Sequence, residues 1–405
     1  MKIYRFALLS HVLPPSPSGQ AVMLYRILVG VNPALYYLMS RESYVKNASR
    51  ESSAYFLPVH YFRLDSGKWL YWLDQLESCF ICDFISILLK ILSRAIGILR
   101  TLRLNPTMAL IACSGDIADI PAGFLASRMA KIPFFAYLFD DYVHQWTGNY
   151  RLVAKWIAPF IFKRSVGVIG PNELICEEYQ RRYGVAATLV RNPCDEAELS
   201  REPLQRWPAE DHKIKIIYTG ALYHVNFDCF SNLIQTMGTL PEYNLELHIY
   251  TAQTQSQLES IGISGERIFI HSHVPYNRIV EEQRKADILF LPLAFNSPIP
   301  MVIRTSAPGK MGEYLASGRP VLAHVRSDTF VAYYFRKYRC GGLVDQYSSL
   351  SLAAMIKKLI LDGAFRFEIT QNARRQAGLD FSPELARNQL LKLLYIDQIT
   401  ENFPT

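Results

Sequence analysis

Short apolar segments recur along the chain and alternate with longer segments whose apolar positions have helical spacing. The segments that read as buried strands are 6–10, 108–113, 133–139, 166–169, 214–220, 245–250, 268–270, 286–291 and 320–323. Helical spacing follows several of them, over 21–30, 120–130, 172–183 and 228–237. Strands that alternate with helices build parallel sheets, so the pattern predicts an α/β protein with doubly wound, Rossmann-like sheets.

The alternation occurs in two series, separated by a polar segment that contains Pro203 and Pro208. A chain of 405 residues also exceeds one typical core. We therefore expect two domains joined by a linker, followed by a C-terminal helix that is a candidate to cross back onto the first domain. The expected bounds are 1–195 with an insertion at 42–105, then 196–212, 213–382 and 383–405.

The segment 306–321, S-A-P-G-K-M-G-E-Y-L-A-S-G-R-P-V, predicts a short helix that begins at its first or second residue and ends at Gly318. Pro308 is expected in the first turn. The N–H groups of that turn, the cation of Lys310 and the carboxylate of Glu313 would suit a sugar nucleotide, with phosphates on the donors and ribose hydroxyls on the carboxylate. The alternative is a solvated lysine–glutamate pair on an ordinary surface helix.

Four polar side chains follow strands of the first series: Asp116, Asp140, Asp141 and His144. Ligands of open parallel sheets bind off the carboxyl ends of strands, so these residues are candidates for chemistry. The adjacent aspartates could instead bind a divalent metal, but no further ligand is evident, and we expect no metal.

Two glycines also lie at or after the carboxyl ends of predicted strands. Gly19 lies in the loop that follows the first strand, and Gly220 ends the strand 214–220. Glycine permits close approach of the backbone to a ligand, such as a phosphate. A plain surface connection at Gly19 and a turn at Gly220 are the alternatives.

The formal charge of +7 favours anionic partners but falls short of the dense basic stripe of a nucleic-acid-binding protein. The seven scattered cysteines argue against a disulfide framework, and Cys79-x-x-Cys82 reads as free thiols rather than half of a zinc site. The N-terminus has no signal-peptide pattern, and no segment is long and apolar enough to span a membrane. We expect a cytoplasmic protein.

The segment 85–103 has apolar residues at helical spacing, and its cations fall mostly off that stripe. The apolar positions are Ile85, Leu88, Leu89, Leu92, Ile96 and Leu99, and the cations are Lys90, Arg94, Arg100 and Arg103. A basic amphipathic helix, preceded by Trp69, Tyr71 and Trp72, suits a membrane surface, which would be the inner face of the membrane. The alternative is a core-facing helix with a solvated basic side.

Four motifs together resemble the GT-B fold of nucleotide-sugar glycosyltransferases, most closely the retaining superfamily typified by glycosyltransferase family 4. The segment S-H-V-L-P-P-S-P-S-G-Q resembles the opening loop of that family, and F-D-D-Y-V-H-Q-W resembles its aspartate-bearing segment. The segment L-V-R-N-P-C-D resembles the exit from its first domain, and P-G-K-M-G-E-Y-L-A-S-G-R-P-V resembles its donor-binding helix. The last motif is the most specific.

The resemblance implies that Glu313 binds ribose. It also implies that Lys310 and the start of its helix, which Pro308 and Gly309 precede, lie near the diphosphate. Gly19 would lie close to the donor phosphates, across a cleft between the domains. The sequence departs from the family in having Thr305 where a second glutamate is frequent.

The family's arginine and lysine after the glycine that matches Gly220 are also missing, with Ala221 and Asn226 nearby. Arg304 is the substitute that we expect to contact phosphate. Asp116 takes the place of an acceptor-side histidine.

The resemblance predicts a retaining transferase that moves a sugar from a nucleotide sugar, expected to be a UDP-sugar, to the hydroxyl of a glycan, lipid-linked or small-molecule acceptor. Such a reaction serves the synthesis of glycans, glycolipids or cell-envelope polysaccharides and needs no cofactor. Asp141 or Asp116 would take the acceptor's proton or orient the sugar, and His144 completes the expected catalytic set. The rivals are a sugar-nucleotide epimerase of the same fold and a catalytically silent partner subunit.

Overall fold

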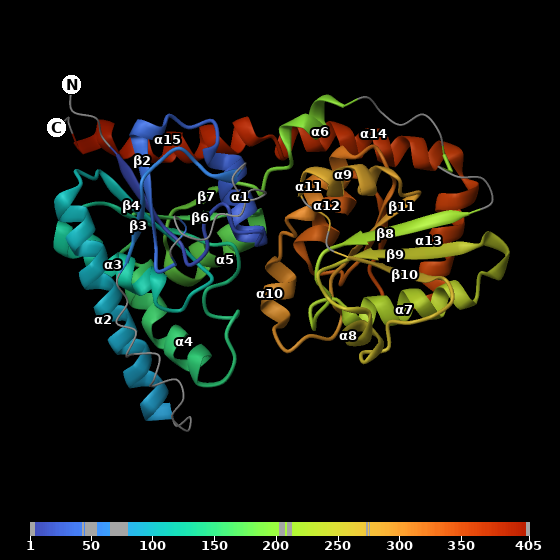
Figure 1. Ribbon diagram of the computed structural model, residues 1–405, viewed down its shortest axis with the longest axis horizontal. Coiled ribbons are helices and arrows are strands. Elements are labelled where there is room, and N and C mark those ends of the chain that lie inside the picture. Colours follow the sequence, from blue (N-terminus) through green and yellow to red (C-terminus); the bar gives the residue numbers. More distant parts are fainter. Residues whose placement is uncertain are drawn as a thin grey trace. The chain divides into compact units, whose positions relative to one another are not determined.

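The computed structural model describes residues 5–42, 44, 55–64, 80–201, 207–208, 213–272, 274 and 276–401. The chain divides into two compact units, one made of residues 1–191 with 384–405 and the other of residues 192–383. Each unit is built on a parallel sheet with helices on both faces (Figure 1). The predicted α/β class is confirmed.

The sheet of the first unit has seven strands in the order β3-β2-β1-β4-β5-β6-β7. Every pairing in it is parallel. Their bounds are β1 Phe6–Leu9, β2 Tyr36–Ser40, β3 Tyr61–Arg63, β4 Ala109–Cys113, β5 Phe134–Tyr137, β6 Gly167–Gly170 and β7 Ala187–Leu189.

Alternate residues of β1 face opposite layers of helices because side chains alternate along a strand. Ala7 and Leu9 belong to the core beneath α2 Phe80–Leu104, α3 Asp119–Ala130, α4 Gly148–Phe162 and α5 Glu173–Tyr183. Phe6 and Leu8 belong to a second core, which includes residues of α1 Gly19–Leu28 and α15 Pro383–Glu401. The C-terminal helix α15 therefore completes the first unit.

The sheet of the second unit has six parallel strands in the order β10-β9-β8-β11-β12-β13. Their bounds are β8 Ile214–Thr219, β9 Leu245–Tyr250, β10 Ile268–His271, β11 Ile288–Pro292, β12 Val321–His324 and β13 Gly342–Val344. The helices are α6 Glu196–Ser200, α7 Phe227–Gly238, α8 Gln255–Glu259, α9 Tyr276–Arg284, α10 Pro300–Thr305, α11 Lys310–Ala316, α12 Phe330–Tyr338, α13 Ser349–Leu361 and α14 Gly363–Asp380. Short 3-10 turns cover Pro33–Leu35 and Pro241–Tyr243.

Two local features differ from the sequence-based expectations. The segment 42–105, expected as an insertion, contributes β3 and α2 to the first unit. The helix expected to bind the donor, α11, begins at Lys310 rather than at Ser306 or Ala307, and α10 precedes it. Its stop agrees with the prediction, since Gly318 has a left-handed φ of 78°.

Candidate functional site

The second unit has a topological switch point between β8 and β11. These strands are neighbours at the centre of the sheet, and the chain leaves them toward opposite edges. Loops diverge at such a point and leave room for a ligand off the carboxyl ends of the strands. Gly220 follows β8, and α10 and α11 follow β11. The sequence-predicted residues Gly220, Lys310 and Glu313 thus belong to segments that start from one place in the sheet.

Gly220 lies directly against Lys310. Its φ is 125°, a conformation that side chains other than glycine rarely adopt, and a Cβ atom there would lie 2.7 Å from Nζ of Lys310. The positive φ therefore favours glycine at this position, and a side chain there would displace the end of Lys310.

The ammonium group of Lys310 lies 3.8 Å from the centroid of the Tyr218 ring. It makes no hydrogen bond or ion pair with the residues that the structure describes, so its main electrostatic contact is with the electron-rich face of the ring. Burial lowers the pKa of Lys310 to about 7, although the nearby charge of Glu313 acts in the opposite direction. A desolvated cation without a paired carboxylate is a site prepared for an anion.

Glu313 is buried one turn further along α11, and its Oε2 atom accepts a hydrogen bond of 3.0 Å from Nε2 of Gln283. The same Gln283 nitrogen donates to Oγ1 of Thr219 at 3.2 Å. The hydroxyl group of Tyr314 lies 3.1 Å from that Oγ1 atom and accepts from the Thr219 N–H group at 3.0 Å. The carboxylate is therefore held in one orientation by residues of α9, β8 and α11.

Gln283 was not predicted from the sequence. It lies on α9, a helix with few apolar positions, and nothing local marks it as a functional residue. Its buried Oε1 atom has no hydrogen-bond partner among the described residues. An unpaired buried acceptor beside Glu313 leaves a position for a donor such as a ribose hydroxyl.

The loop after Gly220 is fixed by side chains that take the place of the expected cations. Asn226 is buried, accepts from the N–H group of Tyr223 at 3.0 Å, and donates to the carbonyl of Ala221 at 3.2 Å. The amide group of Gln253 binds both the N–H and the carbonyl of Leu222, at 2.7 and 3.0 Å. These contacts give the loop a defined shape without an arginine or lysine.

The helix start was expected to offer free N–H groups. Its first turn begins after Pro308 and Gly309, and the N–H group of Met311 already donates to the carbonyl of Pro308 at 2.9 Å. Arg304 lies half-buried in the last turn of α10. Lys310 is thus the main source of positive charge that the structure places beside Gly220.

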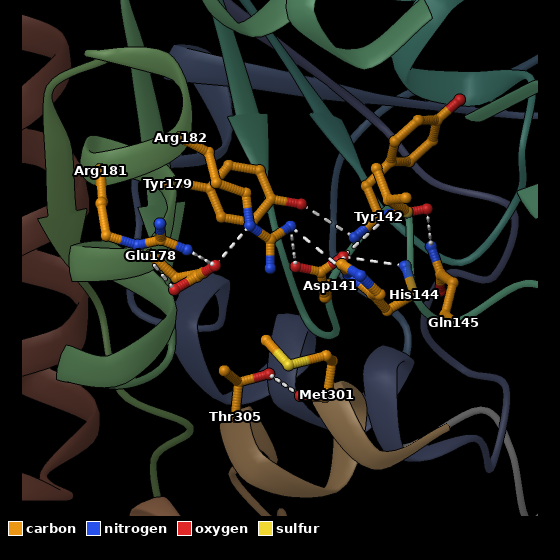
Figure 2. Close-up of polar contacts among 11 residues, drawn as sticks. Asp141, Tyr142, His144, Gln145, Glu178, Tyr179, Arg181, Arg182, Met301 and Thr305 are labelled. Carbon is orange, nitrogen blue, oxygen red and sulfur yellow. Dashed lines mark hydrogen bonds and ion pairs between the residues drawn. The ribbon is translucent and has the colours of Figure 1, made fainter. Parts of the chain in front are cut away.

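Thr305, where a second glutamate was expected, is buried, and its Oγ1 atom donates to the carbonyl of Met301 in the same helix at 2.9 Å (Figure 2). A threonine that bonds to its own helix has no polar hydrogen left to offer a ligand.

In the first unit, Gly19 is exposed at the start of α1, and a Cβ atom there would meet nothing within 4 Å. Ser18 caps this helix by accepting from the N–H group of Ala21. The first unit itself therefore does not require glycine at position 19, and the space in front of it is open.

Asp141 is fully buried and anchors a polar network (Figure 2). One oxygen accepts from the N–H groups of Val143 and His144 at 3.0 and 2.8 Å, and the other accepts from Nη1 of Arg182 at 2.8 Å. Arg182 in turn forms an ion pair with Glu178. Burial by itself would raise the pKa of Asp141, but the hydrogen bonds from His144 and the charge of Arg182 outweigh it and lower the pKa below its ordinary value.

Asp141 also contacts the ring of His144. Nδ1 of His144 lies 2.8 Å from Oδ1 of Asp141. Nη1 of Arg182 lies 3.4 Å from the same Nδ1 atom. A carboxylate on one ring nitrogen favours the tautomer that carries its hydrogen there. Nε2 of His144 makes no hydrogen bond to any residue that the structure describes, and the side chain is partly exposed. His144 is thus better placed than Asp141 to take a proton.

Asp116 is held by cations. Nη1 of Arg94 donates to it at 2.7 Å, and Arg41 lies within 3.5 Å. Burial acts to raise the pKa of Asp116, yet the charge and hydrogen bond of Arg94 lower it. Arg94 is itself buried and also forms an ion pair with Asp119. A carboxylate paired in this way is a poor base, which weakens the expectation that Asp116 acts in catalysis.

Asp140 differs from Asp116 and Asp141, the other two candidate carboxylates. It follows β5 and is half-buried, and its carboxylate forms no ion pair with the described residues. Burial and the adjacent charge of Asp141 raise the pKa of Asp140 to about 6. This carboxylate can therefore exchange a proton near neutral pH, a property that depends on solvation and could not be read from the D-D pair in the sequence.

Among the described residues, no three histidine, cysteine, aspartate or glutamate side chains are grouped so that they could bind a metal ion. None of the described helices is long and apolar enough to cross a membrane. Cys82 is exposed, and Cys79, the other cysteine of the C-x-x-C sequence, lies outside the described residues.

Comparison with known proteins shows what this architecture is similar to. Residues 213–362 match the family model of the group 1 glycosyl transferases, so the second unit contains a domain of that group. No curated protein matches the sequence.

Solved structures match over nearly the whole chain. Sucrose-phosphate synthase from Thermosynechococcus elongatus is 14% identical with a TM-score of 0.70, over 98% of this chain and 100% of the other. The Anabaena protein HepE, in complex with UDP and glucose, is 15% identical with a TM-score of 0.67, over 97% and 99%. WaaG, a glycosyltransferase involved in lipopolysaccharide biosynthesis, is 13% identical with a TM-score of 0.62, over 95% and 98%. The predicted GT-B fold is confirmed.

Proposed function

We propose that the protein is a retaining glycosyltransferase that takes a sugar from a nucleoside-diphosphate sugar, expected to be a UDP-sugar, and transfers it to an acceptor hydroxyl. The group 1 domain in the second unit supports transferase activity. The complex of the similar HepE structure with UDP and glucose supports the donor class. Glycan, glycolipid or cell-envelope polysaccharide synthesis is the setting in which such a reaction is used.

One observation carries the donor assignment: the half-buried ammonium group of Lys310, without an ion pair among the described residues, occupies the space beside Gly220 where any other residue would place its side chain. Lys310 can place its charge on the diphosphate, where negative charge increases as the bond from the sugar carbon to the phosphate oxygen breaks. Stabilising that charge in a desolvated site is a large catalytic effect. Binding of the diphosphate also raises the lysine's pKa and keeps it charged.

We assign ribose binding to Glu313, whose carboxylate is oriented by Gln283. We assign the acceptor to the first unit, where His144 and Asp140 offer sites that can take the proton of a hydroxyl group. The new glycosidic bond forms on the face from which the diphosphate leaves, and the proton passes to one of these groups or to the departing phosphate.

The experiment is nucleotide binding by calorimetry with UDP, GDP, ADP and their sugar conjugates, followed by the Glu313→Gln variant with the best ligand. We expect a loss of affinity of about tenfold or more, because a charge-assisted hydrogen bond to ribose contributes about 1.5–3 kcal/mol. Glu259→Gln, at an exposed position on α8, is the matched control and should bind as the unmodified protein does. Failure of all nucleotides to bind would favour a silent partner subunit.

Incubation of the donor without an acceptor distinguishes a transferase from an epimerase. A transferase consumes the donor only when an acceptor or water takes the sugar, whereas an epimerase changes the sugar of the donor alone. Recovery of an altered sugar nucleotide after incubation without acceptor would refute the transferase proposal.

A further inference from the structure

The first unit exposes a set of large apolar side chains on two of its helices. They lie on α2 and α4, and we call them the α2–α4 surface: Ile85, Leu88, Leu92, Ile96, Leu152, Trp156 and Phe160. Trp156 is 73% exposed and Phe160 is 57% exposed. Single exposed apolar residues are ordinary, but a group of this size on adjoining helices marks an interaction site.

Four residues of the predicted apolar stripe of α2 are exposed on the first unit: Ile85, Leu88, Leu92 and Ile96, whereas Leu99 is buried. Ile87, Ile91, Ala95 and Ile98 fill the core on the inner side, while the exposed stripe has Ile85 at one end and Ile96 at the other. The helix is apolar on both sides, so a core-facing helix with a solvated polar side does not describe it. The exposed stripe alone is about 16 Å long at 1.5 Å per residue.

The helix α4 extends this surface. Leu152, Trp156 and Phe160 are spaced four residues apart and share one exposed face of α4. The ring of Trp156 contacts that of Phe84 on α2, with centroids 5.9 Å apart. Figure 1 shows the two helices on the same side of the unit, α2 in blue-cyan and α4 in green. The two exposed faces are therefore neighbours.

The charges on these helices are almost all positive. The exposed cations are Arg100, Arg103, Lys155, Lys163 and Arg164. The guanidinium group of Arg164 lies 4.4 Å from the centroid of the Phe160 ring. Asp83 is the acidic residue of α2, and it accepts a hydrogen bond from Asn149, while α4 has no acidic residue. Arg94 is not part of this surface, because it is buried in its ion pairs with Asp116 and Asp119.

We propose that the α2–α4 surface binds the face of an anionic lipid bilayer. Apolar and aromatic side chains with flanking cations match the acyl and headgroup layers of such a bilayer. A second copy of the chain is a poorer occupant, because it would bring the same cations against one another. The inference depends on the first unit alone and is independent of the donor site in the second.

The test is cosedimentation of the full chain with vesicles of phosphatidylglycerol and phosphatidylcholine, compared with vesicles of phosphatidylcholine alone, at near-physiological salt. We expect binding to the anionic vesicles and a loss of about tenfold or more when Leu92, Trp156 and Phe160 are changed to Ser. Replacing Lys155 and Lys163 by Gln should also weaken binding and reduce its sensitivity to salt.

The matched control changes three exposed apolar residues of the second unit to Ser: Leu350, Leu361 and Phe367. It should bind vesicles as the unmodified chain does. Absence of binding to anionic vesicles, or an equal loss in the control, would overturn the proposal. So would a stable dimer in light scattering that the substitutions on α2 and α4 dissociate. Nucleotide binding by each variant, measured without vesicles, shows that the chain is folded and keeps this test separate from that of the proposed function.

Discussion

The pKa of Lys310 makes the affinity for nucleotide depend on pH. Because this pKa is about 7, the charged fraction of the lysine falls from about nine-tenths at pH 6 to about one-tenth at pH 8. A diphosphate binds the charged form, so the affinity should fall about tenfold over this interval, which corresponds to about 1.4 kcal/mol. Binding at pH 8 should also take up close to one proton per site.

The assay is calorimetry of a sugar nucleotide in buffers with different ionisation enthalpies, which gives both affinity and proton uptake. Lys310→Met keeps the apolar stem and removes the charge, so the variant should bind weakly and without the pH dependence. Lys357→Met, at a surface lysine with an ion pair 3.6 Å long to Glu242, is the matched control. Affinity that stays constant between pH 6 and 8, or proton uptake that survives in Lys310→Met, would refute the reasoning.

Three further predictions concern stability. Gly220→Ala should lower the free energy of unfolding, measured in urea, by about 1–3 kcal/mol, because position 220 has a positive φ and Lys310 lies beside it. Gly238→Ala is the control and should not lower it, because a Cβ atom there meets no atom within 4 Å. Arg182→Met removes the cation that pairs with the buried carboxylate of Asp141, and it should lower the free energy of unfolding by about 3–5 kcal/mol. Arg181→Met, at a 71% exposed position, should lower it by less than about 1 kcal/mol, and equal losses would contradict this prediction. Asp140 has a folded pKa of about 6 against an ordinary 3.8, so the folded state binds more protons and stability falls as pH rises through that window. Asp140→Asn should remove this fall and gain up to about 3 kcal/mol at pH 7, less the part that solvent screens at this half-buried position.

The sequence was informative where a residue's role depends on its local context. The motif around Lys310 and Glu313 identified the segment that the structure places at the switch point of the second sheet. Gly318 ended its helix as predicted. The parallel architecture followed from the alternation of short apolar segments and helices, because buried parallel strands are apolar throughout.

Other features depend on contacts between residues far apart in the chain. A partner of Asp141 is Arg182, which is 41 residues away, and the sequence gives no sign of this pairing. The three-residue strand β3 is too short to produce a periodic signal, so its segment was interpreted as an insertion. In α2 the apolar stripe was visible, but which side of the helix faces the core is decided by packing against α3.

The cysteine pattern and the aromatic residues before α2 stay untested. Cys79, Trp69, Tyr71 and Trp72 lie outside the described residues. The free thiol at Cys79 and the contact of the three aromatic residues with a membrane stay predictions. The vesicle experiment addresses the neighbouring surface directly, since Trp156 and Leu92 are exposed and described.

A crystal structure with a bound sugar nucleotide would show the donor site itself. We expect the diphosphate within hydrogen-bonding distance of Nζ of Lys310, beside Gly220, and a ribose hydroxyl group on the carboxylate of Glu313. A nucleotide bound elsewhere, with Lys310 still against the ring of Tyr218 and Glu313 without a ligand contact, would contradict this expectation.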